Sequence, residues 1–159
     1  MNRPALLAHA TAVAIDGRGV LLTGGSGSGK SDLALRLIER GAILICDDCC
    51  DIVDGPDGPD IHARPSIAGQ IEMRGVGILE RHHVASAPLA MMLQLDRPPE
   101  RMPDEDGRIA LGGWSVPGFA LAPFEVSAPL KVEALLRRTV DAGRYPMRLE
   151  TSGYNRGVA

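Results

Sequence analysis

Residues 24–31 have the sequence Gly-Gly-Ser-Gly-Ser-Gly-Lys-Ser and match every fixed position of the phosphate-binding pattern G-x-x-x-x-G-K-[ST]. Its four glycines allow positive φ angles, so that main-chain N–H groups turn inward and can donate to phosphate oxygens. The lysine would reach the β- and γ-phosphates, and the last serine would offer its hydroxyl to Mg²⁺, which binds oxygen ligands. The competing interpretation is a flexible Gly/Ser linker. The predicted nucleotide-binding loop consists of Gly24, Gly25, Ser26, Gly27, Ser28, Gly29, Lys30 and Ser31.

The segments on either side of this loop favour phosphate binding. Residues 20–23 form an apolar run that is typical of a buried strand. Residues 31–40 carry apolar side chains at helical spacing, and Gly41 is suited to end that helix. A strand, a glycine loop and a helix in this order create an anion site at a helix N-terminus, which a linker would lack.

Length and charge exclude several classes of protein. At 159 residues, the chain fits a single catalytic domain over residues 1–159. Its net charge of -3 argues against nucleic-acid binding, which needs a basic face. No apolar run approaches the length of a membrane span, and the apolar N-terminal stretch is too short for a signal peptide. We therefore expect a cytoplasmic protein with no nucleic-acid partner and no membrane partner.

Three cysteines, Cys46, Cys49 and Cys50, lie within five residues. Such an odd, crowded set does not resemble a secreted disulfide framework. A zinc site would need a second Cys/His pair beyond the C-x-x-C spacing, and the sequence supplies none at a suitable distance. We expect buried or half-buried reduced thiols.

Residues 9–23 predict a β-hairpin that turns at residues 16–19. A turn centred there would make paired positions sum to about 35 and set His9 opposite the start of the glycine loop. Pairing alone leaves two alternatives open, an imidazole near the phosphates or a histidine with no role at a strand end.

A second buried-type strand at residues 42–46 ends in the pair Asp47-Asp48. In a βαβ unit this strand runs parallel to the first, so both carboxylates reach the edge that carries the glycine loop. One carboxylate can orient the Mg²⁺ shell, and the other can accept a proton from an attacking hydroxyl. The alternative is that they cap the following turn.

Together with the glycine loop, the rest of the chain predicts an α/β fold, a P-loop kinase-like domain with a mixed central sheet. We expect a short strand and turn at residues 51–65 and a core strand at residues 89–95. Residues 97–108 are charged and broken by prolines, which indicates a surface loop, and residues 124–126 could add a strand. A C-terminal helix is predicted at about residues 129–142 from its apolar stripe.

Residues 71–78 have the sequence Ile-Glu-Met-Arg-Gly-Val-Gly-Ile, in which charged residues interrupt an apolar stretch. The pattern alone allows either a salt-bridged strand or a binding site. Together with the glycine loop and the Asp47-Asp48 pair, this string resembles the catalytic domain of HPr kinase/phosphorylase, whose signature contains I-E-x-R-G-x-G-I. The resemblance covers about residues 9–155. It implies an ATP-dependent, Mg²⁺-dependent kinase that phosphorylates a serine of the phosphocarrier protein HPr, and a hexameric assembly.

The same resemblance implies roles for individual residues. The catalytic set would be His9, Lys30, Asp48 and Arg101, with Asp48 accepting a proton in phosphorylation and donating it in the reverse reaction. The Mg²⁺ ligands would be Ser31 and Glu72, with Asp47 as a further candidate.

Two departures from the family pattern qualify the expectation. Full-length members carry an N-terminal domain that is missing here, so we expect the short form found in some proteobacteria. The residues after Lys131 do not reproduce the usual G-R-N continuation, so kinase activity is better supported than phosphorolysis. The alternatives are a P-loop kinase of a small metabolite and a non-catalytic ATP-sensing regulatory module.

Overall fold

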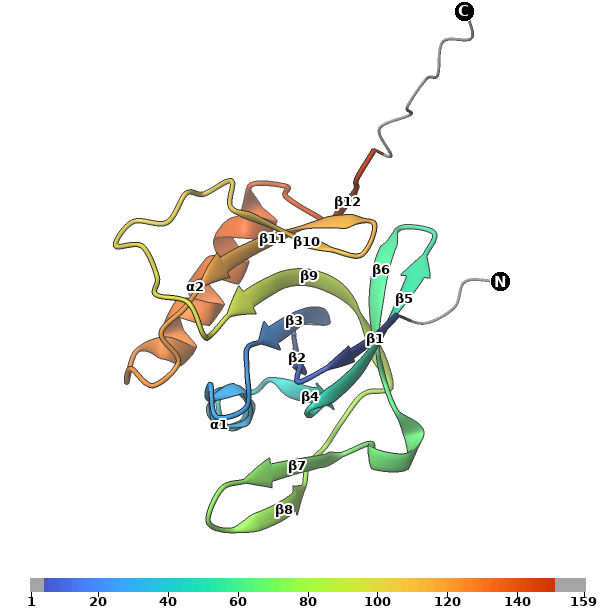
Figure 1. The fold of residues 1–159 in the computed structure, drawn as a ribbon, viewed down its shortest axis with the longest axis vertical. Helices are drawn as coiled ribbons and strands as arrows, with labels where there is room; N and C mark the ends of the chain where they lie inside the picture. Colours follow the sequence, from blue (N-terminus) through green and yellow to red (C-terminus); the bar gives the residue numbers. More distant parts are fainter. Residues whose placement is uncertain (1–4, 151–159) are drawn as a thin grey trace, which may run out of the picture.

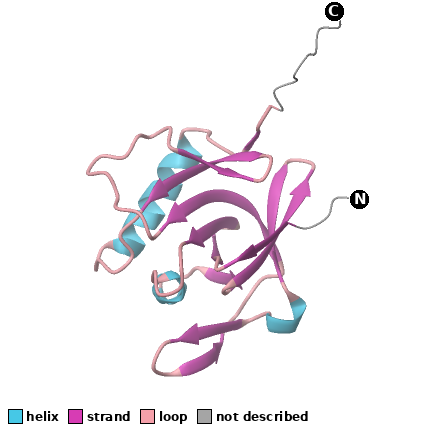
Figure 2. Cartoon of the chain, viewed as in Figure 1, coloured by secondary structure: helices cyan, strands magenta, loops and turns pink. Residues whose placement is uncertain are grey.

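The computed structural model describes residues 5–150 and shows a mixed sheet flanked by two α-helices, with a separate β-hairpin beside it (Figure 1). Figure 2 shows how strands dominate the described part of the chain. The helices are α1 (Lys30–Glu39) and α2 (Ala128–Asp141), and a short 3-10 helix spans Pro65–Ile67. The strands are β1 (Ala5–Ala8), β2 (Thr11–Ile15), β3 (Arg18–Thr23), β4 (Ile43–Cys46), β5 (Cys49–Gly55), β6 (Gly58–Ala63), β7 (Gln70–Met73), β8 (Gly77–Glu80), β9 (Ser86–Gln94), β10 (Arg108–Leu111), β11 (Trp114–Ala120) and β12 (Met147–Arg148).

Strand β9 is the centre of the sheet. In the described residues the strands follow the order β1-β5-β6-β9-β3-β2-β4, and β11 also pairs with β9. Strands β3 and β11 run parallel to β9, whereas β6 runs antiparallel to it. One edge of β9 pairs first with β6 and then with β11, so the sheet forks there. The mixed central sheet predicted from the sequence is confirmed.

The β2–β3 hairpin has a shorter turn than the sequence predicted. Thr11 pairs with Leu22 and Ile15 pairs with Arg18, so paired positions sum to 33 and the prediction of about 35 was wrong. The turn consists of Asp16 and Gly17 alone, with φ angles of 50° and 78°. Two positive φ angles are typical of a type I′ turn, whose twist matches the flanking strands, so Arg18 can already belong to β3.

Strand β4 is antiparallel to β2, which is itself antiparallel to β3. Strands β4 and β3 therefore run in the same direction with β2 between them. The expectation that residues 42–46 form a strand ending at the edge of the glycine loop is confirmed. The strand that separates β4 from β3 was not foreseen, because a βαβ unit usually makes the two strands neighbours.

Two apolar clusters lie on opposite faces of the central strands because alternate side chains point to opposite faces. Val20 and Leu22 belong to the cluster that packs against both helices, whereas Leu21 belongs to the other. The second cluster is closed by β5, β6 and β11, which contribute Ile52, Ile61, Trp114 and Val116. The helices cover one face, and the forked part of the sheet encloses the other.

Several other elements can be compared with the sequence. The C-terminal helix is confirmed within one residue at each end, and residues 97–107 form the expected loop. The strand content of residues 51–63 was underestimated, since in place of one short strand and a turn they complete a hairpin of β5 and β6. Residues 124–126 form a turn that leads into α2, so the expectation of a strand there was wrong. Neither α1 nor α2, the α-helices of the described residues, is long and apolar enough to cross a membrane.

The structure contains a disulfide between Cys46 and Cys50, whose Cα atoms are 5.7 Å apart. The expectation of three reduced thiols was therefore wrong for this pair, and Cys49 is the free, half-buried cysteine. Cys46 ends β4 and Cys50 lies in β5, and both side chains belong to the second apolar cluster. Sequence spacing pointed to Cys46 and Cys49 as the related pair, whereas the fold turns Cys50 toward Cys46.

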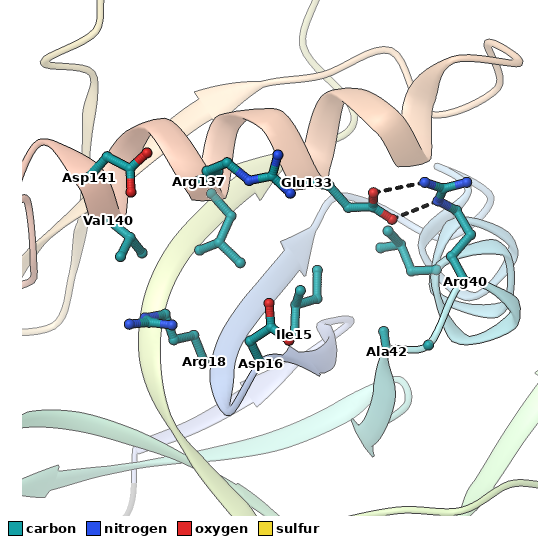
Figure 3. A pocket seen from close by; sticks show the side chains of 12 residues that line it. Ile15, Asp16, Arg18, Arg40, Ala42, Glu133, Arg137, Val140 and Asp141 are labelled. Carbon is teal, nitrogen blue, oxygen red and sulfur yellow. Dashed lines mark hydrogen bonds and ion pairs between the residues drawn. The ribbon is translucent and has the colours of Figure 1, made fainter.

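A cavity of about 360 Å³ lies where the C-terminal half of α2 faces the end of α1 and the β2–β3 turn (Figure 3). Arg40 donates two hydrogen bonds to Glu133 there, at 2.6 and 2.9 Å, and so links α1 to α2. These hydrogen bonds from the guanidinium lower the pKa of the Glu133 carboxyl. Because α1 begins at the glycine loop, this cavity lies at the opposite end of that helix.

Candidate active site

The glycine loop connects β3 to α1 and has the backbone that its sequence predicts. Gly24, Gly27 and Gly29 have φ angles of 149°, 80° and 94°, which L side chains rarely adopt. A Cβ at Gly24 would lie 2.5 Å from the Ser28 hydroxyl oxygen, and one at Gly29 would lie 3.0 Å from the Phe124 ring. The loop therefore needs glycine for both conformation and space, and it ends at the N-terminus of α1.

Lys30 is held beneath this loop. Lys30 is only 7% exposed. Its Nζ donates to the carbonyl oxygens of Gly24 (2.9 Å) and Gly25 (3.0 Å). An ammonium has three donors, so a further one can point toward a ligand. Positive charge at the start of a helix is suited to binding an anion.

Asp47 is the central junction of the site. Its Oδ1 accepts hydrogen bonds from the hydroxyls of Ser31 (2.7 Å) and Thr11 (2.9 Å). Its Oδ2 accepts a hydrogen bond from the backbone N–H of Glu72 (3.0 Å). One carboxylate thus joins β2, the first turn of α1, the end of β4 and β7. Sequence reasoning ranked Asp47 behind Glu72 and missed Thr11, whose polar side chain at the start of an apolar strand was the available signal.

Asp48 points away from this junction. Its side chain is 73% exposed and its φ is 62°, a conformation that Asp tolerates better than most residues. The His9 Nδ1 approaches its Oδ1 at 3.6 Å, and the His9 backbone N–H donates to its carbonyl oxygen at 2.8 Å. The Asp48 backbone N–H donates to the buried Thr11 hydroxyl at 3.2 Å. The structure therefore gives the two neighbouring aspartates different positions, one bonded inward and one exposed to solvent in the cavity.

These groups line one cavity of about 450 Å³. Its lining includes most of the residues singled out from the sequence, which come from the turn before β2, the glycine loop, the start of α1, the turn after β4, and β7. They are His9, Ser26, Gly27, Gly29, Lys30, Ser31, Asp47, Asp48 and Glu72. Arg101 does not line this cavity, since it lies exposed in the loop before β10. Its catalytic role stays a prediction.

The signature string at residues 71–78 forms most of the β7–β8 hairpin, which Figure 1 shows apart from the main sheet. Ile71 is 1% exposed and anchors the hairpin in the apolar cluster beneath the helices. Glu72 and Arg74 are exposed and line the cavity, so the string contributes to the site rather than to a buried salt bridge.

Phe124 is a lining residue that the sequence did not point to. It belongs to the turn before α2, and its ring lies against Gly29 at the end of the loop. Arg36 of α1 donates to the carbonyl oxygens of Pro123 and Glu125, which flank it. No local pattern predicts this contact, because 95 positions separate Gly29 from Phe124.

Ser31, Asp47 and Glu72 line this cavity and carry oxygen atoms, the ligand type that Mg²⁺ prefers. Within residues 5–150, no group of three or more His, Cys, Asp or Glu side chains is placed to hold a metal ion. Mg²⁺ is usually bound through one or two protein carboxylates plus substrate phosphates and water. A serine hydroxyl bonded to a carboxylate beside a phosphate loop agrees with that mode of binding.

Comparison with known proteins gives a consistent result. A family model described as HPr Serine kinase C-terminal domain matches residues 3–87. The chain is 31% identical over 156 residues to the HPr kinase/phosphorylase of Lactiplantibacillus plantarum, covering 92% of this chain and 49% of the relative. It is 33% identical over 153 residues to the HPr kinase/phosphorylase of Burkholderia lata, covering 86% and 47%. The chain thus spans about half the length of the curated relatives it matches.

A solved structure shares the fold. The Hpr(Ser) kinase/phosphatase from Coxiella burnetii superposes with a TM-score of 0.73 at 28% sequence identity, covering 87% of this chain and 92% of that one. The family model takes in the glycine loop, the Asp47-Asp48 pair and the signature string, which the structure assembles around one cavity. With more than half of its residues matched in this way, the chain belongs to the HPr Serine kinase C-terminal domain family.

Proposed function

We propose that this protein is an ATP-dependent kinase that phosphorylates a serine of HPr. The observation that carries the proposal is the pair of adjacent aspartates at the glycine loop, where Asp47 is bonded to Ser31 and Asp48 is exposed in the same cavity. The names of the relatives support HPr as the acceptor. Cytoplasmic location and a hexameric assembly stay part of this proposal.

Binding of the triphosphate would rest on the loop and the start of α1. The inward N–H groups of the loop donate to phosphate oxygens, and Lys30 neutralises their charge at the helix N-terminus. Ser31, Asp47 and Glu72 would hold Mg²⁺, which when bound neutralises charge on the phosphates. Such a site works mainly by placing its groups and stabilising charge.

Proton transfer would be the task of Asp48. The seryl hydroxyl gives its proton to the Asp48 carboxylate while its oxygen forms a bond to the γ-phosphorus. The bond between that phosphorus and the bridging oxygen breaks, and ADP leaves with the electron pair. His9 lies beside Asp48 and can donate a hydrogen bond that orients the carboxylate. Arg101 keeps a proposed catalytic role from the family resemblance alone.

The test is an assay of HPr phosphorylation with MgATP. Asp48→Asn should lower kcat by about 100-fold or more while the Kd for MgATP stays within about threefold, because a general base typically contributes that much to a rate. Asp57→Asn is a matched control, since it removes the same charge from the remote turn between β5 and β6. Wild-type kcat in Asp48→Asn would show that the assigned base is wrong.

The same preparation separates the rival functions. A kinase of a small metabolite would leave HPr unmodified and consume ATP with a member of a metabolite panel. A regulatory module would bind MgATP and give no product with either acceptor. Incubation of phosphate with seryl-phosphorylated HPr tests the reverse reaction.

A further inference from the structure

The Phe124 ring lies at the mouth of the cavity that carries the glycine loop. It is 68% exposed and does not belong to either apolar cluster. Two ring carbons lie 3.0 Å from the position that a Cβ at Gly29 would take. Among the described residues that line this cavity, Phe124 is the only phenylalanine, tyrosine or tryptophan.

The turn that carries this ring is tied to the nucleotide-binding helix. Arg36 donates from Nη1 to the Glu125 carbonyl oxygen at 3.0 Å and from Nη2 to the Pro123 carbonyl oxygen. The same guanidinium pairs with Asp32, one turn earlier on α1, at 3.1 Å. Arg36 therefore positions the residues on both sides of Phe124 relative to the first turn of α1.

Core packing does not account for this arrangement. A phenylalanine that stabilises a fold is normally buried, whereas this ring leaves most of its surface in solvent. Holding an exposed aromatic ring in a fixed turn is useful when a flat, apolar group binds against it. The cavity beside the ring already contains the groups that would bind a triphosphate, and a nucleobase is the flat group of a nucleoside triphosphate.

We propose that Phe124 stacks on the nucleobase and so forms the base subsite of this protein. The inference rests on the proposed nucleotide binding and adds to it the residue that contacts the base. Stacking on an aromatic ring is tolerant of base identity, because every base has a π-face. Phe124 therefore contributes affinity for purine nucleotides in general and little discrimination between ATP and GTP.

The decisive experiment compares two magnesium complexes, one with a base and one without. Isothermal titration calorimetry gives the Kd of MgATP and of magnesium tripolyphosphate for the wild type and for Phe124→Ala. Alanine should raise the Kd of MgATP about 5- to 150-fold, the range expected when one stacking partner is removed. The Kd of magnesium tripolyphosphate should stay unchanged. Val126→Ala is the matched control, since Val126 is 98% exposed in the same turn and does not line the cavity.

A tryptophan at the same position gives an independent signal. Phe124→Trp should keep MgATP affinity near that of the wild type, and stacking should quench its fluorescence on addition of MgATP. Magnesium tripolyphosphate should leave the fluorescence unchanged. The native Trp114 is 7% exposed and lines neither cavity, so it adds a constant background.

Four results would overturn the inference. An equal loss of affinity for both ligands in Phe124→Ala would mean that the ring only supports the loop through Gly29. Unchanged affinity for both ligands would place the base elsewhere, with the proposed function intact. Unchanged affinity together with a raised KM for HPr would assign the ring to docking of the protein substrate. A wild type that bound neither ligand would remove the proposed function as well.

Discussion

Replacing Asp47 with alanine should destabilise the fold as well as the site, because this carboxylate accepts three hydrogen bonds from three segments. The donors are the Ser31 hydroxyl, the Thr11 hydroxyl and the Glu72 N–H. Hydrogen bonds to a charged group contribute about 1.5–3 kcal/mol each. The Ser31 hydroxyl and the exposed Glu72 N–H can bond to water instead, whereas Thr11 is 0% exposed.

The expected magnitude follows from that difference. Only the Thr11 hydroxyl would be left buried without an acceptor, which costs about 1–3 kcal/mol, and the two other bonds add a smaller loss as water replaces the acceptor. We expect the free energy of unfolding to fall by about 2–4 kcal/mol, a large part of the 5–15 kcal/mol typical of a domain. The midpoint of urea unfolding, followed by circular dichroism, measures this change.

A double-mutant cycle makes the reasoning specific. Thr11→Val removes the buried donor, so Asp47→Ala should cost about 1 kcal/mol less in the Thr11→Val background than in the wild type. Asp57→Asn is the control for loss of charge and should stay within about 0.5 kcal/mol of the wild type. If Asp47→Ala lost less than about 0.5 kcal/mol, or if the two changes added independently, the hydrogen bonds would not couple these segments.

Three further changes test other parts of the structure. Reduction of the Cys46–Cys50 disulfide, which joins positions four apart, should lower the free energy of unfolding by about 2 kcal/mol through loop closure. Urea unfolding measures that loss, and a thiol titration that finds three free thiols in the unreduced protein would contradict the disulfide. Gly29→Ala should lower the free energy of unfolding by about 1–2 kcal/mol, because alanine is strained at its φ of 94°, and should weaken MgATP binding. A variant with the wild-type Kd for MgATP in titration calorimetry would refute the assigned loop geometry. Because Arg40 lowers the pKa of Glu133 in the folded state, their pairing stabilises above the unfolded pKa of Glu133 and is lost as pH falls through the folded pKa. Glu133→Gln should therefore be slightly less stable at neutral pH, and thermal unfolding should show this gap closing at acidic pH, whereas a constant gap would refute the pairing.

Much of the framework was predictable because its causes are local. The glycine loop requires positive φ angles that glycine supplies, and the apolar stripes of α1 and α2 have a helical period. The strand before Asp47 is a continuous apolar run, which is typical of burial on both faces. Each of these features depends on residues close together in the chain, so the pattern alone was enough.

The different environments of the two aspartates in the site depend on the tertiary structure. Asp47 and Asp48 are the same residue type in adjacent positions, and only the packing of β2 and β7 turns one inward and leaves the other exposed. The same packing supplies the Thr11 hydroxyl, 36 positions away from its acceptor. Side-chain chemistry sets what each group can do, but contacts across such distances depend on how the sheet and its hairpins fold together.

The sequence by itself thus determined a glycine loop at the start of a helix, a second helix, a mixed sheet and the two carboxylates at its edge. The fold alone decided that Cys50 pairs with Cys46 and that the Phe124 turn closes over Gly29. The physical reason is that backbone conformation follows from neighbouring residues, whereas side-chain partners depend on which distant segments are packed against each other.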